Sequence, residues 1–97
     1  MPKLVRDRIP EIMRAAGKEP KTHIADEEEY WKRLKEKLRE EAAEFTADEK
    51  EEELADVFEV VRAIAEFKKF DLENIEAMRE KKAKERGGFS KRIVLDG

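Results

Sequence analysis

Two long helix-forming stretches, separated by only a few residues, most constrain the fold. In the first, residues 26–45, apolar side chains recur at the spacing of one helix face: Trp31, Leu34, Leu38 and Phe45. The second runs to about residue 69 and repeats that spacing with Leu54, Val57, Phe58, Val61 and Ile64. Because the connection is short, the sequence predicts an antiparallel helical hairpin.

The signals at the helix ends agree with this hairpin. Asp26 has the residue type of an N-cap for the first long helix. Thr46 followed by Glu49 has the capping-box spacing, so we expect the chain to turn and to start the second long helix within a few residues.

Shorter helices are expected on either side of the hairpin. Pro10 fits the first turn of a helix that ends at Gly17, where a left-handed cap is easy. Asp71 can cap a last helix that Gly87 stops. In that helix we expect an inward face made of Leu72, Ile75 and Met78.

The tail from Phe89 to Leu95 has strand-like composition and could pair with Leu4 and Val5. The predicted fold class is therefore all-α: an antiparallel helical bundle with a long helical hairpin, completed by oligomerisation, with short extended N- and C-terminal tails. Residues 1–97 are expected to form a single domain.

Four acids lie where the two helices of the hairpin meet. Glu41 and Glu44 are near the end of the first helix, and Glu53 and Asp56 are near the start of the second. Each pair is spaced i,i+3, so its two carboxylates share a helix face. Glu41 also falls within the apolar stripe, which indicates that it faces inward.

Inward-facing acids need a counter-charge, because two carboxylates about 4 Å apart repel by about 4 kcal/mol at an effective dielectric constant near 20. No Lys or Arg is apparent on this face, so a divalent cation is the simplest candidate. Ligation by oxygen alone favours Mg²⁺, Mn²⁺ or Ca²⁺ over Zn²⁺. The alternative is a solvated acidic face with no ligand.

Composition excludes several other functions. Charged residues are 48% of the chain, but both signs are interspersed and the net charge is -3, so we expect no duplex nucleic acid partner. The chain contains no cysteine, which excludes disulfides, thiolate metal sites and thiol catalysis. With no apolar run long enough for a bilayer and no secretory leader, we expect a cytoplasmic protein without a membrane partner. The lack of glutamine beside abundant Lys, Arg and Glu suggests a heat-adapted source.

Four segments carry a resemblance to a known family. KLREEAAEF (37–45) and EEELADVFEVV (51–61) resemble the EExxE and ExxD motifs of the MazG-like, all-α nucleoside triphosphate pyrophosphohydrolase superfamily, which includes phosphoribosyl-ATP pyrophosphohydrolase. KLVRDRIPEIM (3–13) and KKAKERGGFSKRIVL (81–95) resemble the ends of a compact subgroup of that superfamily. The resemblance thus spans nearly the whole chain.

This resemblance implies a homodimer or homotetramer that cleaves a nucleoside triphosphate between its α and β phosphates with Mg²⁺, or Mn²⁺ in its place. The products would be a nucleoside monophosphate and pyrophosphate. The metal ligands of the family fall on Glu41, Glu44, Glu53 and Asp56. Glu40 is the first acid of the motif and is assigned to the substrate side. The eight residues between Glu44 and Glu53 make a shorter connection than in many members.

Roles for single residues follow from the same resemblance. Either Glu44 or Glu41 could take the proton of the attacking water. Lys82, Lys84 and Arg86 are the expected phosphate contacts, with Arg6 and Lys3 after them. Two alternatives remain open: phosphoribosyl-ATP pyrophosphohydrolase itself, and a helical nucleotide-binding or assembly module without turnover.

Overall fold

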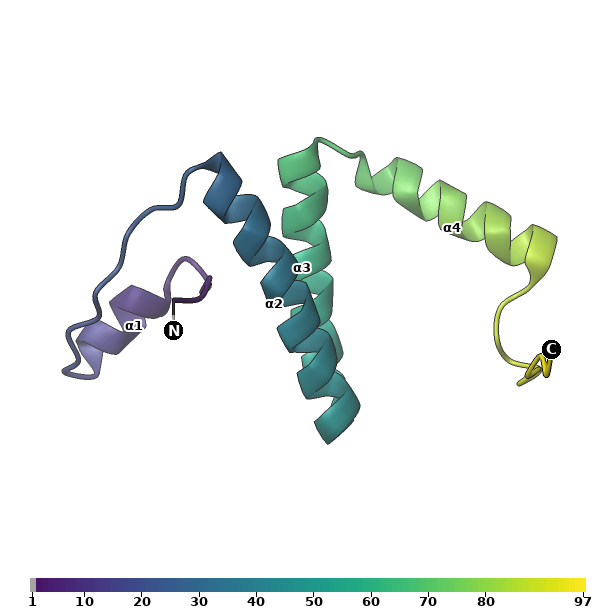
Figure 1. Ribbon diagram of the computed structural model, residues 1–97, viewed down its shortest axis with the longest axis horizontal. Coiled ribbons are helices and arrows are strands. Elements are labelled where there is room, and N and C mark those ends of the chain that lie inside the picture. The colour runs from purple at the N-terminus through teal and green to yellow at the C-terminus, as the bar shows by residue number, and fades with distance from the viewer. Residues whose placement is uncertain (1) are drawn as a thin grey trace. The chain divides into compact units, whose positions relative to one another are not determined.

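The computed structural model describes residues 2–97 and contains four α-helices (Figure 1). They are α1 (Ile9–Ala15), α2 (Glu27–Asp48), α3 (Glu51–Lys68) and α4 (Leu72–Arg86). Residues 2–97 contain no strand, so the all-α class is confirmed. The chain divides into two compact units, one ending at Ile64 and the other covering Ala65–Gly97.

The predicted strand in the C-terminal tail is wrong. Residues 93–97 have no regular secondary structure, and Phe89 and Leu95 are almost fully exposed. A ladder of two such short segments would form few hydrogen bonds, and an isolated pair of strands is marginally stable at best. β-Branched composition alone therefore does not produce a strand here.

The hairpin is formed by α2 and α3, which run antiparallel with only Glu49 and Lys50 between them (Figure 1). The capping role predicted for Thr46 is wrong, because α2 continues through Thr46, whose hydroxyl donates to the carbonyl oxygen of Ala43 at 3.0 Å. The next helix, α3, does begin within a few residues, at Glu51. Glu49 instead ends α2 in the left-handed region, at φ 56°, and its N–H donates to the carbonyl oxygen of Phe45. The connection between the acidic pairs is therefore mostly helix.

The other helix ends agree with the sequence. The Asp26 carboxylate accepts from the N–H of Glu29 at 2.8 Å, and the Asp71 carboxylate accepts from the N–H of Glu73 at 2.9 Å. After α1, Gly17 has φ 84°, a conformation that a residue with a Cβ adopts only with strain. These caps fix where three of the four helices begin or end.

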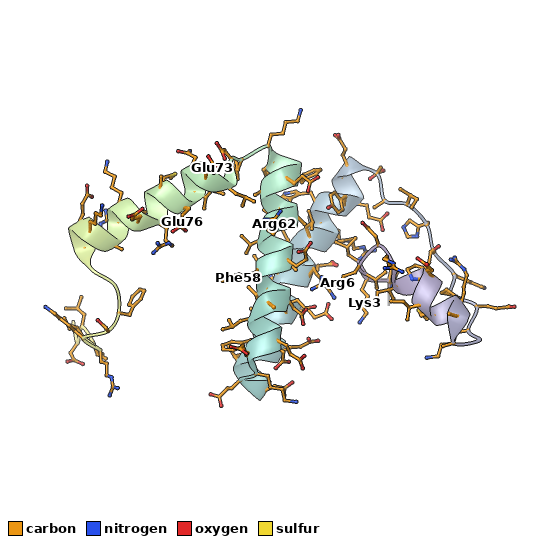
Figure 2. All side chains as sticks on the ribbon, turned by 180° about the vertical axis from the view of Figure 1, so that it is seen from behind. Lys3, Arg6, Phe58, Arg62, Glu73 and Glu76 are labelled. Carbon is orange, nitrogen blue, oxygen red and sulfur yellow. The ribbon has the colours of Figure 1, made fainter. Side chains whose placement is uncertain are left out.

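Few apolar side chains are buried. Leu34 of α2 is 1% exposed, and Val60 of α3 is also buried. On α3 the exposed large apolar residues Leu54, Phe58 and Val61 recur at i, i+4 and i+7, so they form one stripe. Figure 2 shows Phe58 on the side of α3 away from Arg6. The hairpin thus carries an apolar stripe that its own unit leaves exposed.

The prediction that α4 has an inward-facing apolar side is also wrong. α4 has no buried residues, and Leu72, Ile75 and Met78 are all exposed. None of the helices in residues 2–97 combines the length and the apolar character needed to cross a bilayer.

Candidate functional site

Glu41 is the only buried charged residue among residues 2–97, with 7% of its surface exposed. It lies on the face of α2 that also carries Leu34 and therefore turns toward the interior of the hairpin. Its Oε1 lies 3.0 Å from the Nζ of Lys37, one turn earlier. Its Oε2 is buried and has no hydrogen-bond partner. Glu41 is thus a buried carboxylate with one oxygen neutralised and one left over.

Lys37 also connects Glu41 to Glu40. The Nζ of Lys37 lies 3.6 Å from Glu40 Oε2, and the Nζ of Lys3 lies 3.6 Å from Glu40 Oε1. Burial is the largest single influence on the pKa of Lys37 and lowers it. The hydrogen bond to Glu41 and the charges of Glu40 and Glu41 together outweigh burial, so the pKa of Lys37 is raised. Glu40 is therefore half-exposed at the edge of the site, between two ammonium groups.

Glu44 follows Glu41 by one turn and is exposed. The negative charge of Glu41 is the main reason that the pKa of Glu44 is raised above its ordinary value, with desolvation second and a hydrogen bond to Glu41 third. A raised pKa makes this carboxylate a better proton acceptor near neutral pH. The structure thus brings the two acids of α2 together, as their spacing predicts.

Glu53 is the first acid of the pair at the start of α3. Its Oε1 is buried without a hydrogen-bond partner. Desolvation raises the pKa of Glu53, and Asp48, by a hydrogen bond and by its charge, raises it further. Asp48 is the last residue of α2, and sequence reasoning did not identify it. The helical spacing could have done so, since Asp48 continues the row Glu41, Glu44 by about one turn.

Asp56 has a partner from the other end of the sequence. Its Oδ1 accepts from Nη2 of Arg6 at 2.8 Å, although the two residues are 50 positions apart. Both side chains are about half-exposed. Lys3, from the same N-terminal segment, lies 3.6 Å from Glu40 of α2, and both cations are labelled in Figure 2.

The prediction that no Lys or Arg neutralises this face is wrong. Lys37 pairs with Glu41, and Arg6 pairs with Asp56. The reason differs for the two cations. Lys37 was overlooked although it lies on the same helix face, whereas Arg6 reaches the site by tertiary folding that no local spacing reveals. Within residues 2–97, no three His, Asp or Glu side chains are grouped closely enough to hold a metal ion.

The donor atoms nevertheless suit a hard cation. Glu41 Oε2 and Glu53 Oε1 are carboxylate oxygens, the atoms that Mg²⁺ and Mn²⁺ favour. Both are buried without a partner, and a buried acceptor in that state costs about 1–3 kcal/mol. A cation would remove this cost at either oxygen, so Glu41 and Glu53 are the residues whose free donor atoms suit one, although no three acids among residues 2–97 surround a single point.

The predicted phosphate contacts lie on a different unit. Lys82, Lys84 and Arg86 occupy the last turns of α4 and are exposed. Lys84 lies 3.7 Å from Glu80, one turn earlier, which is an ordinary surface pair on a helix. These cations belong to the unit Ala65–Gly97, whereas the four acids belong to the unit that ends at Ile64.

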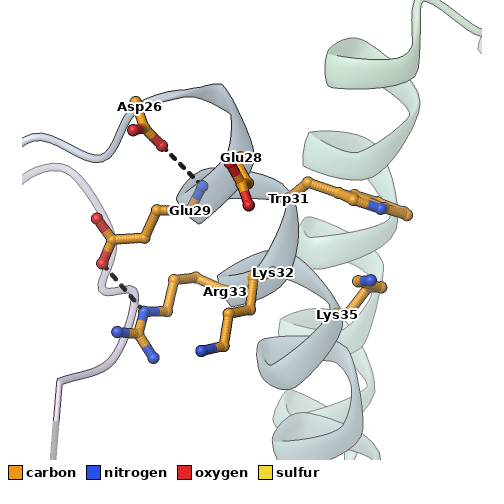
Figure 3. A pocket seen from close by; sticks show the side chains of 7 residues that line it. All are labelled: Asp26, Glu28, Glu29, Trp31, Lys32, Arg33 and Lys35. Atoms are coloured by element: carbon orange, nitrogen blue, oxygen red, sulfur yellow. Dashed lines mark hydrogen bonds and ion pairs between the residues drawn. The ribbon is translucent and has the colours of Figure 1, made fainter.

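An open pocket lies beside the first turns of α2 (Figure 3). Its lining is mostly charged and includes Glu29, Arg33 and Trp31. Glu29 accepts from Arg33 at 3.3 Å, and its Oε1 lies 2.9 Å from Nε2 of His23. The Nζ of Lys35 lies over the Trp31 ring, 5.2 Å from its centre. This arrangement is an ion-pair network that anchors the start of α2.

Comparison with known proteins gives one partial relative. A curated protein of Mycolicibacterium smegmatis is 51% identical over 47 residues, which are 48% of this chain and 48% of that protein. It is described only as an uncharacterized protein. The matched region thus spans about half the length of that relative. No protein-family model matches the chain, and no solved structure gives a significant match.

Proposed function

We propose that this protein is a Mg²⁺-dependent nucleoside triphosphate pyrophosphohydrolase that releases a nucleoside monophosphate and pyrophosphate. The proposed location is the cytoplasm, and the proposed role is to clear surplus or non-standard nucleotides. The observation that carries the proposal is the pair of buried, unpartnered carboxylate oxygens on Glu41 and Glu53. The motifs that resemble the MazG-like superfamily contain both residues.

Each acid has a role that its surroundings support. Glu41 and Glu53 would hold the cation, since each has a desolvated carboxylate oxygen without a hydrogen-bond partner. Glu44 is the better candidate for the base, because its raised pKa favours taking a proton from water and its exposed position leaves it open to solvent. When bound, Mg²⁺ would neutralise the phosphate charge and polarise the phosphoryl oxygens.

The test is a panel of nucleoside triphosphates with Mg²⁺ or Mn²⁺, read by pyrophosphate release. We expect at least one substrate to be cleaved, and Glu41→Gln and Glu53→Gln to lose that activity. Glu36→Gln is the matched control, because Glu36 lies on the same helix but pairs with Arg33. Phosphoribosyl-ATP belongs in the panel as the narrower alternative. A panel without pyrophosphate release would reject the proposal.

A second candidate is a helical nucleotide-binding or assembly module without turnover. Two observations favour it: Arg6 and Lys37 already neutralise two of the acids, and no three acids within residues 2–97 are grouped around one point. Calorimetry separates the two functions. Nucleotide binding without hydrolysis would support the module, and release of pyrophosphate would reject it.

We also propose that the apolar stripe of α3 docks on a second copy of the chain. The stripe consists of Leu54, Phe58 and Val61, and Phe58 is 70% exposed. A short chain with so few buried apolar residues gains little stability from its own core. A two-fold axis would place the same stripe on both partners, so each apolar side chain would meet another of its kind.

A further inference from the structure

Arg62 is a cation without an acid partner beside the exposed apolar stripe of α3. In that stripe, Leu54 and Val61 keep 42% and 40% of their surface exposed. Arg62 is the only basic residue of α3 before Lys68 at its end. Glu66 lies one turn away, yet the Arg62 side chain makes no ion pair or hydrogen bond within residues 2–97. Its charge is therefore left for an acid on another molecule.

Glu51 occupies the other end of the same helix face. It precedes Leu54 by three residues and Phe58 by seven, so these residues and Val61 follow the spacing of a coiled-coil seam. Glu51 is exposed, and its side chain also has no ion-pair or hydrogen-bond partner in the described part of the chain. One apolar stripe thus carries an unpaired acid at one end and an unpaired base, Arg62, at the other.

Charge selects the direction in which two such stripes can meet. A parallel pair about a two-fold axis would place Glu51 against Glu51 of the partner subunit, and Arg62 against Arg62 of the partner subunit. Like charges that face each other across an interface disfavour it strongly. An antiparallel pair instead places Glu51 near Arg62 of the partner subunit, and the two-fold axis repeats this contact.

The apolar residues allow the same register. If Leu54 lies opposite Phe58 of the partner subunit, then Glu51 lies opposite Val61 of the partner subunit, because both steps are three residues in opposite directions. Arg62 of the partner subunit is then only about 1.5 Å further along the axis. We propose that two copies pair through α3 in antiparallel orientation, with Glu51 of each copy bound to Arg62 of the other. This inference rests on the second copy proposed under the function and is independent of the nucleotide chemistry.

Charge reversal with rescue tests the two ion pairs. Arg62→Glu and Glu51→Arg each place like charges at both contacts, so each should raise the dissociation constant of the dimer about ten- to fifty-fold. The double variant exchanges the two charges and should return to within about three-fold of the wild-type value. Analytical ultracentrifugation of the full chain measures these dissociation constants.

Glu52 provides a matched control. It is exposed and follows Glu51 directly, but the helical rotation between neighbours turns it away from the stripe. Arg62→Glu combined with Glu52→Arg has the same composition as the rescued double variant. It should nevertheless dissociate as readily as Arg62→Glu alone, because the added charge lies away from the interface.

Disulfide formation reports the orientation separately. The chain contains no cysteine, so an introduced cysteine can react only with its counterpart on another copy. When Glu51→Cys and Arg62→Cys chains are mixed and mildly oxidised, mass spectrometry should find mainly the mixed disulfide. A main product that joins two Glu51→Cys chains would show a parallel pair and overturn the proposal.

The remaining outcomes overturn it in distinguishable ways. If no charge reversal changes the dissociation constant, or if the double variant is not rescued, Glu51 and Arg62 do not meet, although the dimer stands. A wild-type chain that stays monomeric at micromolar concentration overturns this inference together with the proposed dimer. Neither result decides the proposed hydrolysis, which pyrophosphate release measures independently.

Discussion

Lys37 and Glu41 lie one helical turn apart, with 3.0 Å between Nζ and Oε1, while the second oxygen of the same buried carboxylate has no partner. A side chain in this state stabilises the fold less than an apolar residue of similar size would. Its presence is better explained by a ligand than by packing. The behaviour of Glu41 therefore distinguishes a functional acid from a structural one.

Glu41→Met should raise the free energy of unfolding in EDTA by about 1 kcal/mol, because it removes a buried, half-satisfied charge and keeps the side-chain volume. The same variant should lose Mn²⁺ binding. Urea denaturation and calorimetry give the two readings. Glu36→Met, at a half-exposed position of α2, should change stability by less than about 0.5 kcal/mol. A large loss of stability in Glu41→Met would show that Glu41 supports the fold.

The raised pKa values of Glu44 and Glu53 predict how stability depends on pH without metal. The folded state binds their protons more tightly than the unfolded state, where the ordinary pKa is 4.5. The free energy of unfolding therefore falls as the pH rises through 4.5 and through the raised pKa values. Replacing both residues with glutamine should remove this contribution, so the double variant should gain stability relative to wild type over that range.

Glu76 provides a control of opposite sign. A hydrogen bond from Arg79 is the main reason that the pKa of Glu76 is lowered. Its contribution to stability is present above pH 4.5 and is lost as the pH falls through the lowered pKa. Glu76→Gln should therefore lose stability relative to wild type as the pH rises toward 4.5. Thermal denaturation in EDTA at several pH values measures both variants, and equal signs for the two would contradict the assignment.

Glu49→Gly should stabilise the end of α2. Glu49 adopts φ 56°, where a residue with a Cβ is strained by roughly 1 kcal/mol and glycine is not. We expect the free energy of unfolding to rise by about 0.5–1 kcal/mol in urea. Lys50→Gly, next in the chain but outside the positive-φ region, should lower it instead, because glycine gains entropy in the unfolded state. A loss of stability in Glu49→Gly would contradict this explanation.

Phe58→Glu should disrupt the proposed dimer. Burying a phenylalanine contributes about 2 kcal/mol, and a two-fold interface would lose that amount in each copy. Light scattering coupled to size-exclusion chromatography should show a dimer for the wild type and a monomer for the variant. Ile24→Glu is the matched control, because Ile24 is 96% exposed and lies outside the helices. A wild-type monomer at micromolar concentration would reject the interface.

Local patterns were sufficient for much of the fold. The period of apolar residues predicted α2 and α3, and Asp26 and Asp71 predicted where helices begin, because these signals act within a few residues. The prediction that Thr46 caps a helix was wrong because it depended on a short motif alone. The helical context of α2 outweighed a four-residue motif, and the left-handed Glu49 that ends α2 has no distinctive residue type.

Only part of the candidate site could be predicted from the sequence. Helical spacing predicted that Glu41 and Glu44 act on each other and that Glu41 is buried. The contact between Arg6 and Asp56 spans 50 positions, so it depends on how the N-terminal segment folds back onto the hairpin. The pairing of Glu53 with Asp48 depends on the two-residue turn between the helices.

The most direct test of the central claim is a crystal of the full chain grown with Mn²⁺ and measured near the manganese absorption edge. We expect an anomalous peak within coordination distance of carboxylate oxygens from both α2 and α3, including Glu41 and Glu53. A Mn²⁺-containing crystal without a peak at these oxygens, or with peaks only at exposed acids elsewhere, would contradict the claim.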